Sequence, residues 1–189
     1  MLGSRRLSVA ESLQKLRVPA GFLFGLLFLV TANPCYSRFF PGLGLAVLGS
    51  GLRLWAAGHL RKHRELTVSG PYRWTRNPLY LGSFAMGLGL TVAAGAWWLI
   101  LLFLALFFGF YYPVMIAEER ELLSSYGEPA REYIATTPRF VPLGGHAYRR
   151  GAGAFAWAEV VRNREHHTVL GLALVVLYLL IERSLLCGS

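Results

Sequence analysis

The longest run of residues without a charge constrains this chain most. It extends from Leu79 to Ala117 and contains 39 residues. As one straight helix it would measure roughly 58 Å, whereas the hydrocarbon core of a bilayer is about 30 Å thick. The run must therefore fold back on itself. Its weakest-packing stretch near the middle is Ala93 to Ala96, and Trp97 and Trp98 follow as interfacial anchors. We expect a hairpin of two helices with its turn at that stretch, in contact with lipid.

Three further apolar stretches complete the expected fold. Phe39 to Ala57 is long enough to span a bilayer, whereas Val18 to Ala32 and Thr168 to Ile181 are shorter than the usual ~20 residues. The alternative for the first of these is a cleaved signal peptide, although no small-x-small cleavage site follows it, and the alternative for the last is an interfacial helix. The sequence predicts an all-α polytopic membrane protein of five transmembrane helices, or four if one short stretch does not cross. Residues 1–189 would form a single domain.

The basic residues indicate how the helices are oriented. The chain has 19 Lys and Arg residues and a net charge of +9. They concentrate before the first span, between the second and third, and between the fourth and fifth. With a cytosolic N-terminus, all three regions fall on the cytosolic side, as the positive-inside rule requires. Gly58 to Pro78 and Glu118 to His167 would then be cytosolic, and Cys35 and Cys187 would lie on the opposite side. Because topology accounts for the charge, we expect no nucleic-acid partner.

Two polar clusters flank the charge-free hairpin. The ends of a hairpin emerge on one face of the membrane, so Arg76-Asn77-Pro78 should come close to Glu118-Glu119. The first cluster combines a Gly70-Pro71 turn with a proline suited to the first turn of the next helix. The second cluster continues the fourth span to a helix C-cap at Gly127. A carboxylate pair where a helix leaves the bilayer favours a functional site. The alternative for the first cluster is an interfacial belt of aromatic and arginine anchors. The alternative for the second is a solvated interfacial pair of carboxylates that Arg76 or Arg120 neutralises.

These clusters belong to two blocks that resemble a known family. Glu65 to Tyr72 and Arg76 to Gly82 make up the first block. The second block contains Glu118-Glu119, Leu122, Tyr126-Gly127, Tyr133 and Pro138-Arg139-Phe140-x-Pro142. Together they resemble the isoprenylcysteine carboxyl methyltransferase family, over roughly Trp55 to Pro142. The resemblance implies a methyltransferase that holds S-adenosylmethionine between its two cytosolic segments. Related membrane enzymes of similar architecture methylate phospholipid amines.

The resemblance also implies roles for particular residues. It implies that the cofactor is contacted by Arg64, Glu65, Leu66, Thr67, Tyr72, Asn77, Pro78, Leu79, Tyr80 and Glu118. Arg76 and Glu119 are the catalytic candidates; on a helix, Glu119 is rotated by about 100° from Glu118. An anion placed against the sulfonium would stabilise the ground state more than the transition state. Glu118 should therefore bind ribose hydroxyls or the ammonium group, while Tyr72 or Tyr80 faces the sulfonium.

Two departures from the family leave the methyl acceptor open. Asn77 stands where the family usually has His, although an amide can still donate and accept a hydrogen bond. Val114 stands at the position where the prenylcysteine-specific members of the family that this chain resembles have Arg. The acceptor is therefore expected to be a lipophilic molecule, either a lipid amine or a prenyl or acyl carboxylate. It would reach the site from the bilayer.

Two other functions are alternatives to methyl transfer. An NADPH-dependent membrane sterol reductase shares an Arg-x-Pro-x-Tyr element, but it has Asp, Cys and Lys where Glu118, Glu119 and Ser124-Ser125 stand here. A non-enzymatic membrane scaffold would use both clusters as anchors. No metal is expected, because the histidines show no ligand spacing and are accounted for as solvated loop residues. These are His59, His63, His146, His166 and His167.

Overall fold

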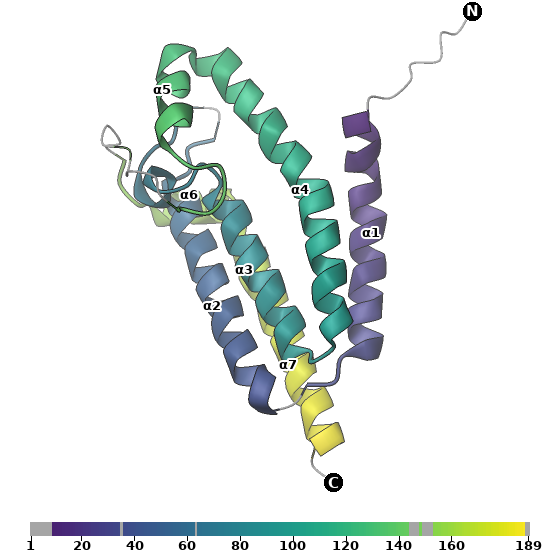
Figure 1. The fold of residues 1–189 in the computed structure, drawn as a ribbon. Helices are drawn as coiled ribbons and strands as arrows, with labels where there is room; N and C mark the ends of the chain where they lie inside the picture. Colours follow the sequence, from purple (N-terminus) through teal and green to yellow (C-terminus); the bar gives the residue numbers. More distant parts are fainter. Residues whose placement is uncertain (1–8, 35, 63, 144–147, 149–152, 188–189) are drawn as a thin grey trace, which may run out of the picture.

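The computed structural model describes residues 9–34, 36–62, 64–143, 148 and 153–187. Within these ranges the secondary structure is entirely helical, which confirms the all-α prediction. The helices are α1 (Val9–Thr31), α2 (Tyr36–His59), α3 (Pro78–Ala93), α4 (Trp97–Tyr126), α5 (Glu128–Thr136), α6 (Trp157–Arg162) and α7 (Glu165–Cys187), with a 3₁₀ helix, η1 (Gly70–Arg73), before α3. The long helices run side by side, and the short helices α5 and α6 gather at one end (Figure 1).

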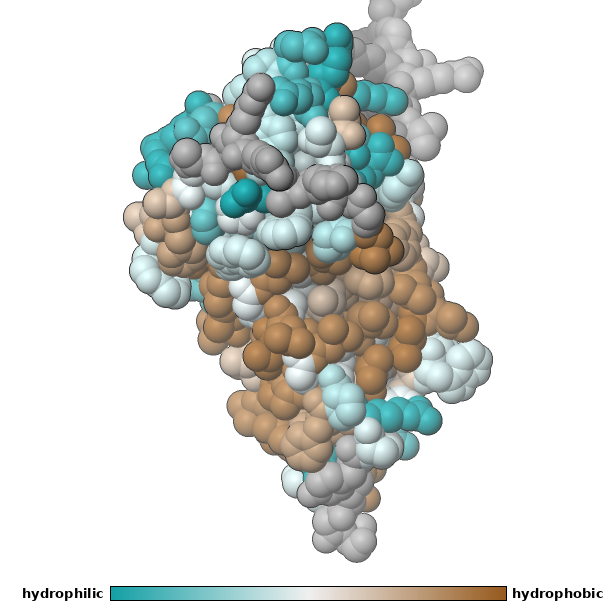
Figure 2. All heavy atoms as spheres, turned by 60° about the vertical axis from the view of Figure 1, so that its left-hand side comes forward, coloured by the Kyte–Doolittle hydropathy of each residue, from teal (hydrophilic) through white to brown (hydrophobic). Residues whose placement is uncertain are grey.

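The long helices have the length and the surface of membrane spans. Among the described residues, three helices are long and apolar enough to cross a bilayer: Ser37–His59, Trp97–Tyr126 and Glu165–Leu186. Val18–Thr31 and Pro78–Ala93 are apolar but shorter. Figure 2 shows a broad band of hydrophobic side chains over the long helices, below a hydrophilic end. An exposed apolar surface of this extent requires lipid around it. The chain is therefore an integral membrane protein.

The charge-free run folds back at the predicted place. α3 ends at Ala93 and α4 begins at Trp97. Between them Gly95 has a φ of +80°, which side chains other than glycine rarely adopt. A Cβ on Gly95 would also overlap the carbonyl oxygen of Asn33, whose amide donates a 2.7 Å hydrogen bond to the carbonyl of Ala94. The hairpin turn thus packs against the α1–α2 connection, at the end opposite α5 and α6 (Figure 1).

The buried apolar core lies at this same end. Every one of the long helices contributes to it, and its members are Phe28, Ala32, Phe39, Ala93, Ala94, Leu99 and Leu179. The helices are therefore tied together around the hairpin turn. Towards α5 and α6, α3 and α4 diverge (Figure 1). Polar residues occupy the divergent end.

Helices α2 and α3 pack most closely of all, through small residues. A Cβ on Gly42, Gly49 or Gly89 would approach backbone atoms of the facing helix to 2.5 Å. Real side chains do not tolerate such contacts, so only glycine permits this approach. Close packing through small residues is a main source of helix association in lipid. The pair α2–α3 forms a firm support for the residues at its polar end.

The structure departs from the sequence predictions at three places. α1 begins at Val9 rather than near Val18, because the helix continues into polar residues that a hydropathy criterion excludes. α7 likewise extends from Glu165 to Cys187, and its apolar length fits a span better than an interfacial helix. His59 was expected to be solvated, but it is buried at the end of α2, with its ring 5.9 Å from that of Phe155.

Candidate functional site

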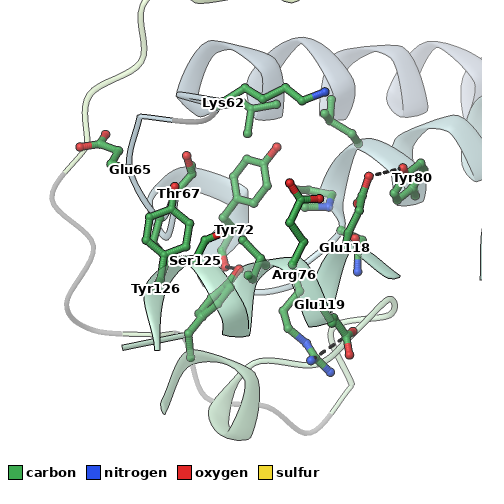
Figure 3. A pocket seen from close by; sticks show the side chains of 18 of the residues that line it. Lys62, Glu65, Thr67, Tyr72, Arg76, Tyr80, Glu118, Glu119, Ser125 and Tyr126 are labelled. Atoms are coloured by element: carbon green, nitrogen blue, oxygen red, sulfur yellow. Dashed lines mark hydrogen bonds and ion pairs between the residues drawn. The ribbon is translucent and has the colours of Figure 1, made fainter. Parts of the chain in front are cut away.

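A cavity of about 680 Å³ lies at the polar end of the helices. Its walls come from the end of α2, the α2–α3 connection, the first turn of α3, the last turns of α4, and α5. All residues that the sequence predicted for the site line it: Arg64, Glu65, Leu66, Thr67, Tyr72, Arg76, Asn77, Pro78, Leu79, Tyr80, Glu118 and Glu119. Figure 3 shows many of these side chains converging from opposite sides. The hairpin thus brings its two ends together, as expected.

A short segment after α5, residues 138–140, holds the first cluster in place; we refer to it as the strap. The amide of Arg76 donates a 2.9 Å hydrogen bond to the carbonyl of Pro138 in the strap. Thr75 Oγ1 donates to the carbonyl of Phe140 at 2.7 Å. Asn77 Nδ2 donates to the carbonyl of Arg139 at 2.8 Å. Asn77 therefore uses its amide to fix the backbone that forms the cavity wall.

Glu118 and Glu119 point to different partners although they are adjacent. Glu118 is exposed at the cavity, and its Oε1 accepts a 2.8 Å hydrogen bond from the hydroxyl of Tyr80. Glu119 is buried, and its two oxygens accept hydrogen bonds of 2.6 and 2.9 Å from Arg139. Figure 3 shows Glu118 directed towards Tyr80 and Glu119 towards Arg76. One carboxylate is open to a ligand, and the other is part of the framework.

Arg76 has the most buried side chain among the cations that line the cavity. Its side chain is 10% exposed, and Nη1 lies 3.1 Å from Oε1 of Glu119 as an ion pair. That contact lacks hydrogen-bond alignment, and both Nε and Nη1 are buried without a hydrogen-bond partner among the described residues. Burial lowers the pKa of Arg76, and the nearby Glu119 carboxylate opposes that change. A buried guanidinium with unsatisfied N–H groups is suited to an anionic or carbonyl oxygen on a ligand.

Two tyrosines form a buried part of the wall. The hydroxyl of Tyr133 donates a 2.7 Å hydrogen bond to the carbonyl of Tyr72. Burial raises the pKa of both phenols, so both stay neutral over the physiological range. Tyr72 thus presents a neutral aromatic ring to the cavity. Tyr133 acts through the backbone of η1 and holds that ring in place.

Several lining residues were not predicted: Arg53, Leu60, Lys62, Glu121, Leu122, Ser125, Tyr126 and Tyr133. The second block of the resemblance contains Leu122, Tyr126 and Tyr133, but no role in the site was predicted for them. Arg53 also had a signal, because a charge inside an apolar span is unusual. Lys62 sits beside the first block with nothing in the sequence to distinguish it from the other basic residues there.

The described residues contain no group of three or more His, Cys, Asp or Glu side chains that could hold a metal ion. Of the histidines considered above, His63 and His146 lie outside the described residues, as does Cys35. The rings of His166 and His167 lie 4.2 Å apart at the start of α7.

Comparison with known proteins connects this cavity to a family. A phospholipid methyltransferase family model matches residues 37–129, from the start of α2 to the start of α5. The match contains both glutamates and the whole first block. No solved structure matches the chain.

Three curated relatives extend this result. The nickel-cobalt-cadmium resistance protein NccN of Alcaligenes xylosoxydans xylosoxydans is 37% identical over 110 residues, 53% of this chain and 46% of that protein. The cobalt-zinc-cadmium resistance protein CzcN of Cupriavidus metallidurans is 37% identical over 105 residues, with the same shares. The protein-S-isoprenylcysteine O-methyltransferase of Schizosaccharomyces pombe is 26% identical over 141 residues, 72% of this chain and 59% of that enzyme.

The chain spans about half the length of the relatives it matches at higher identity, and somewhat more of the third. The family match and the isoprenylcysteine enzyme agree with each other, and the family match covers all the residues that line the cavity except Tyr133. The resemblance inferred from the two sequence blocks is thereby confirmed. The chain is thus similar to the phospholipid methyltransferases over residues 37–129, and to an isoprenylcysteine O-methyltransferase over 72% of its length.

Proposed function

We propose that this protein is an integral membrane methyltransferase that transfers a methyl group from S-adenosylmethionine to a lipophilic acceptor. The observation that carries the proposal is the cavity of about 680 Å³, which is lined by every residue to which the family resemblance gave a role in the site. Its volume falls within the range of about 300 to 1,000 Å³ that small-molecule sites occupy. The proposal includes a single membrane domain over residues 1–189, with its family-like core at about 55–142.

The groups that line the cavity fit the parts of S-adenosylmethionine. Glu118 has a carboxylate that faces the cavity and suits ribose hydroxyls or an ammonium group. Arg76 has buried N–H groups that suit a carboxylate. Tyr72 supplies a neutral ring for a cation–π contact with a sulfonium. We assign Arg64, Glu65, Leu66, Thr67, Asn77, Pro78, Leu79 and Tyr80 to the remainder of the cofactor site.

For methyl transfer, the main task of the protein is to position the cofactor and the acceptor. When bound, the cofactor would supply an electrophilic methyl group and leave as S-adenosylhomocysteine, so no side-chain nucleophile is needed. Alignment of the reacting atoms supplies much of the rate. We assign Arg76 to hold the anionic part of a ligand and Glu119 to hold Arg76. Because the Glu119 carboxylate is covered by Arg139, it presents little negative charge to a sulfonium. That arrangement avoids stabilising the ground state.

A lipophilic acceptor is supported by a second hollow, within the apolar surface. A groove of about 550 Å³ lies between α1 and α4 and is lined by Val18, Gly21, Phe22, Gly25, Leu26, Leu29 and Tyr111. The ring of Tyr111 is 5.4 Å from that of Tyr80, whose hydroxyl meets Glu118. The groove and the cavity thus share a border. We propose that an acyl or prenyl chain enters along this border, as part of a lipid amine or a lipid-linked carboxylate.

The proposed topology has five spans, with the N-terminus and the cavity in the cytosol. The described basic residues from Arg61 to Arg76 and from Arg120 to Arg139 lie at the same end of the long helices as the cavity, which supports this orientation under the positive-inside rule. α3 has 16 residues and measures roughly 24 Å, less than the ~30 Å hydrocarbon core. With the turn after Ala93 at the far interface, the first turn of α3 would lie slightly below the cytosolic interface. That depth suits a reaction between a polar cofactor and a lipid.

Calorimetric titration of the purified protein in detergent tests the proposal. We expect saturable binding of S-adenosylmethionine and no binding of NADPH. Binding of NADPH alone would favour the sterol-reductase alternative. Binding of neither molecule by a folded sample would leave the non-enzymatic scaffold and overturn the methyltransferase proposal. Lipid mass spectrometry of cells with and without the protein would then identify the methylated product.

A further inference from the structure

Arg53 places a charge inside the span Ser37–His59, on the wall of the cavity. Its side chain is 18% exposed and pairs with Glu165, whose side chain is 5% exposed. Nη2 and Nε of Arg53 donate hydrogen bonds of 2.6 and 3.0 Å to the two oxygens of Glu165. Glu165 is the first residue of α7 and lies outside both sequence blocks and the range 37–129 of the family match. Through this pair, Glu165 on α7 contacts a residue of the cavity wall from a part of the chain beyond the family match.

Arg53 is also fixed to α3. Its Nη1 donates to the carbonyl of Leu79 at 3.3 Å and to the hydroxyl of Ser83. Its side chain passes directly over Gly82, where a Cβ would lie 2.6 Å from Arg53 Cγ. These contacts leave the guanidinium little freedom to move. With Glu165 in place, the pair is electrically neutral at the cavity wall.

Two other cations that line the cavity, the buried side chain of Arg76 and the exposed Arg64, are also offset by carboxylates. Arg76 lies against Glu119, and Arg64 lies 3.7 Å from the buried Glu159. Offsetting these charges matters for a cofactor that is itself a cation. S-adenosylmethionine carries a sulfonium, whereas its product S-adenosylhomocysteine carries a neutral thioether. Two unit charges about 10 Å apart at an effective dielectric constant of about 20 interact with an energy worth roughly tenfold in a binding constant.

We propose that Glu165 is a positioning residue that neutralises Arg53 and thereby lets the cavity prefer the cationic cofactor over its neutral product. The inference rests on the proposed function, since it concerns how that cofactor is held. If Glu165 loses its charge, the anchored Arg53 guanidinium remains at the wall as an unpaired cation. It then opposes a sulfonium but not a thioether. A residue that only stabilised the fold would affect both ligands equally.

The experiment measures dissociation constants for S-adenosylmethionine and S-adenosylhomocysteine by calorimetry in detergent. For Glu165→Gln we expect the dissociation constant for S-adenosylmethionine, divided by that for S-adenosylhomocysteine, to rise roughly tenfold. Glu165→Asp keeps the charge, so it should keep the parent's ratio even if both affinities fall. The double variant Arg53→Gln with Glu165→Gln removes both charges and should restore the ratio. Glu182→Gln, near the other end of α7, is the matched control and should behave like the parent.

Two outcomes would overturn the inference, and they are distinguishable. If the parent binds both ligands and Glu165→Gln retains its ratio, the proposed role of Glu165 is wrong while the methyltransferase proposal stands. The same conclusion follows if Glu165→Asp shifts the ratio as far as Glu165→Gln. If the folded parent binds neither ligand, the proposed function fails and the role of Glu165 fails with it.

Discussion

The guanidinium of Arg139 donates two hydrogen bonds to the carboxylate of Glu119, at 2.6 and 2.9 Å. A third hydrogen bond, of 2.9 Å, runs from Arg139 Nη1 to the hydroxyl of Tyr112 on α4. The bonds to Glu119 raise the pKa of Arg139. Because Glu119 also pairs with Arg76, a single carboxylate joins α4, the strap and the first cluster. Glu119 is thus a structural support of the cavity.

This arrangement predicts that Glu119→Gln is destabilising. A glutamine leaves Arg76 without its ion pair and removes one acceptor from Arg139. The free energy of unfolding should fall by about 1 to 3 kcal/mol, the cost of an unsatisfied buried polar group. Thermal unfolding in detergent measures the change. Glu128→Gln is the control, because Glu128 pairs with Arg131 in an exposed i,i+3 pair. Equal shifts in the two variants would contradict the supporting role of Glu119.

Glu118→Gln should behave differently from its neighbour. Its carboxylate faces the cavity and pairs only with the hydroxyl of Tyr80 among the hydrogen bonds of the described residues. Loss of a charge-assisted hydrogen bond to the cofactor costs about 1.5 to 3 kcal/mol, so affinity for S-adenosylmethionine should fall roughly ten- to hundredfold. The unfolding temperature should not change.

Tyr80→Phe separates the two contributions to that effect. It removes the hydroxyl that orients Glu118 but leaves the carboxylate charge in place. We expect a smaller loss of affinity than for Glu118→Gln, and a double variant no weaker than Glu118→Gln alone, because the two side chains act as a unit. Fully additive losses in calorimetric titrations would show that Tyr80 and Glu118 contact the cofactor independently.

The length of the charge-free run and the positions of small residues predicted much of this site. A charge-free run too long for one span must turn, and its two ends must meet, so the proximity of Arg76 and Glu118 followed from length and hydropathy alone. The helix ends at Ala93 and Gly127 followed from small residues and from glycine. These features depend on neighbours in the sequence or on the thickness of the bilayer.

The features that escaped prediction depend on contacts between distant residues. Arg53 and Glu165 are 112 residues apart, and Asn77 and Arg139 are 62 apart. No local pattern specifies which carboxylate meets which arginine. The resemblance assigned Asn77 to the cofactor, whereas its amide is engaged by the strap. Only the folded chain shows that such a residue can form the cavity wall through its backbone.

The α2–α3 interface gives a paired prediction. Gly49 and Gly51 lie on the same helix, but a Cβ on Gly49 would lie 2.5 Å from the amide nitrogen of Met86, whereas a Cβ on Gly51 meets nothing within 4 Å. Gly49→Ala should lower the unfolding free energy by about 1 to 3 kcal/mol through overpacking. Gly51→Ala should be neutral or slightly stabilising, since alanine favours helix. Equal thermal stability of the two variants would show that α2 and α3 are not packed as described.

Cysteine labelling tests the proposed orientation. Cys35 lies outside the described residues, between α1 and α2, and Cys187 is the last residue of α7. The end of α1, the start of α2 and the end of α7 all lie at the end of the long helices opposite the cavity (Figure 1). Single-cysteine variants, Cys187→Ser and Cys35→Ser, should react with a membrane-impermeant thiol reagent in intact cells. If either cysteine reacts only after the membrane is permeabilised, the orientation from the positive-inside rule is wrong for that end.

The groove between α1 and α4 gives the last prediction. Gly25 lines the groove, and a Cβ there meets nothing within 4 Å, so a larger side chain can enter without disturbing the protein. Gly25→Phe should fill part of the space proposed for the acceptor's chain. We expect kcat/KM for a long-chain acceptor to fall roughly tenfold, equivalent to about 1.4 kcal/mol of lost apolar contact, while affinity for S-adenosylmethionine stays unchanged.

Gly171→Phe is the matched control, because Gly171 on α7 also has open space around its Cβ position and lies outside both hollows. Its kcat/KM should equal that of the parent across a panel of acceptors with increasing chain length. The effect of Gly25→Phe should grow with chain length, since a longer chain extends further along the groove from Tyr111. An equal effect on a short, water-soluble acceptor would rule out the groove as the path of the chain. A preference of the parent for such acceptors would rule out a lipophilic substrate altogether.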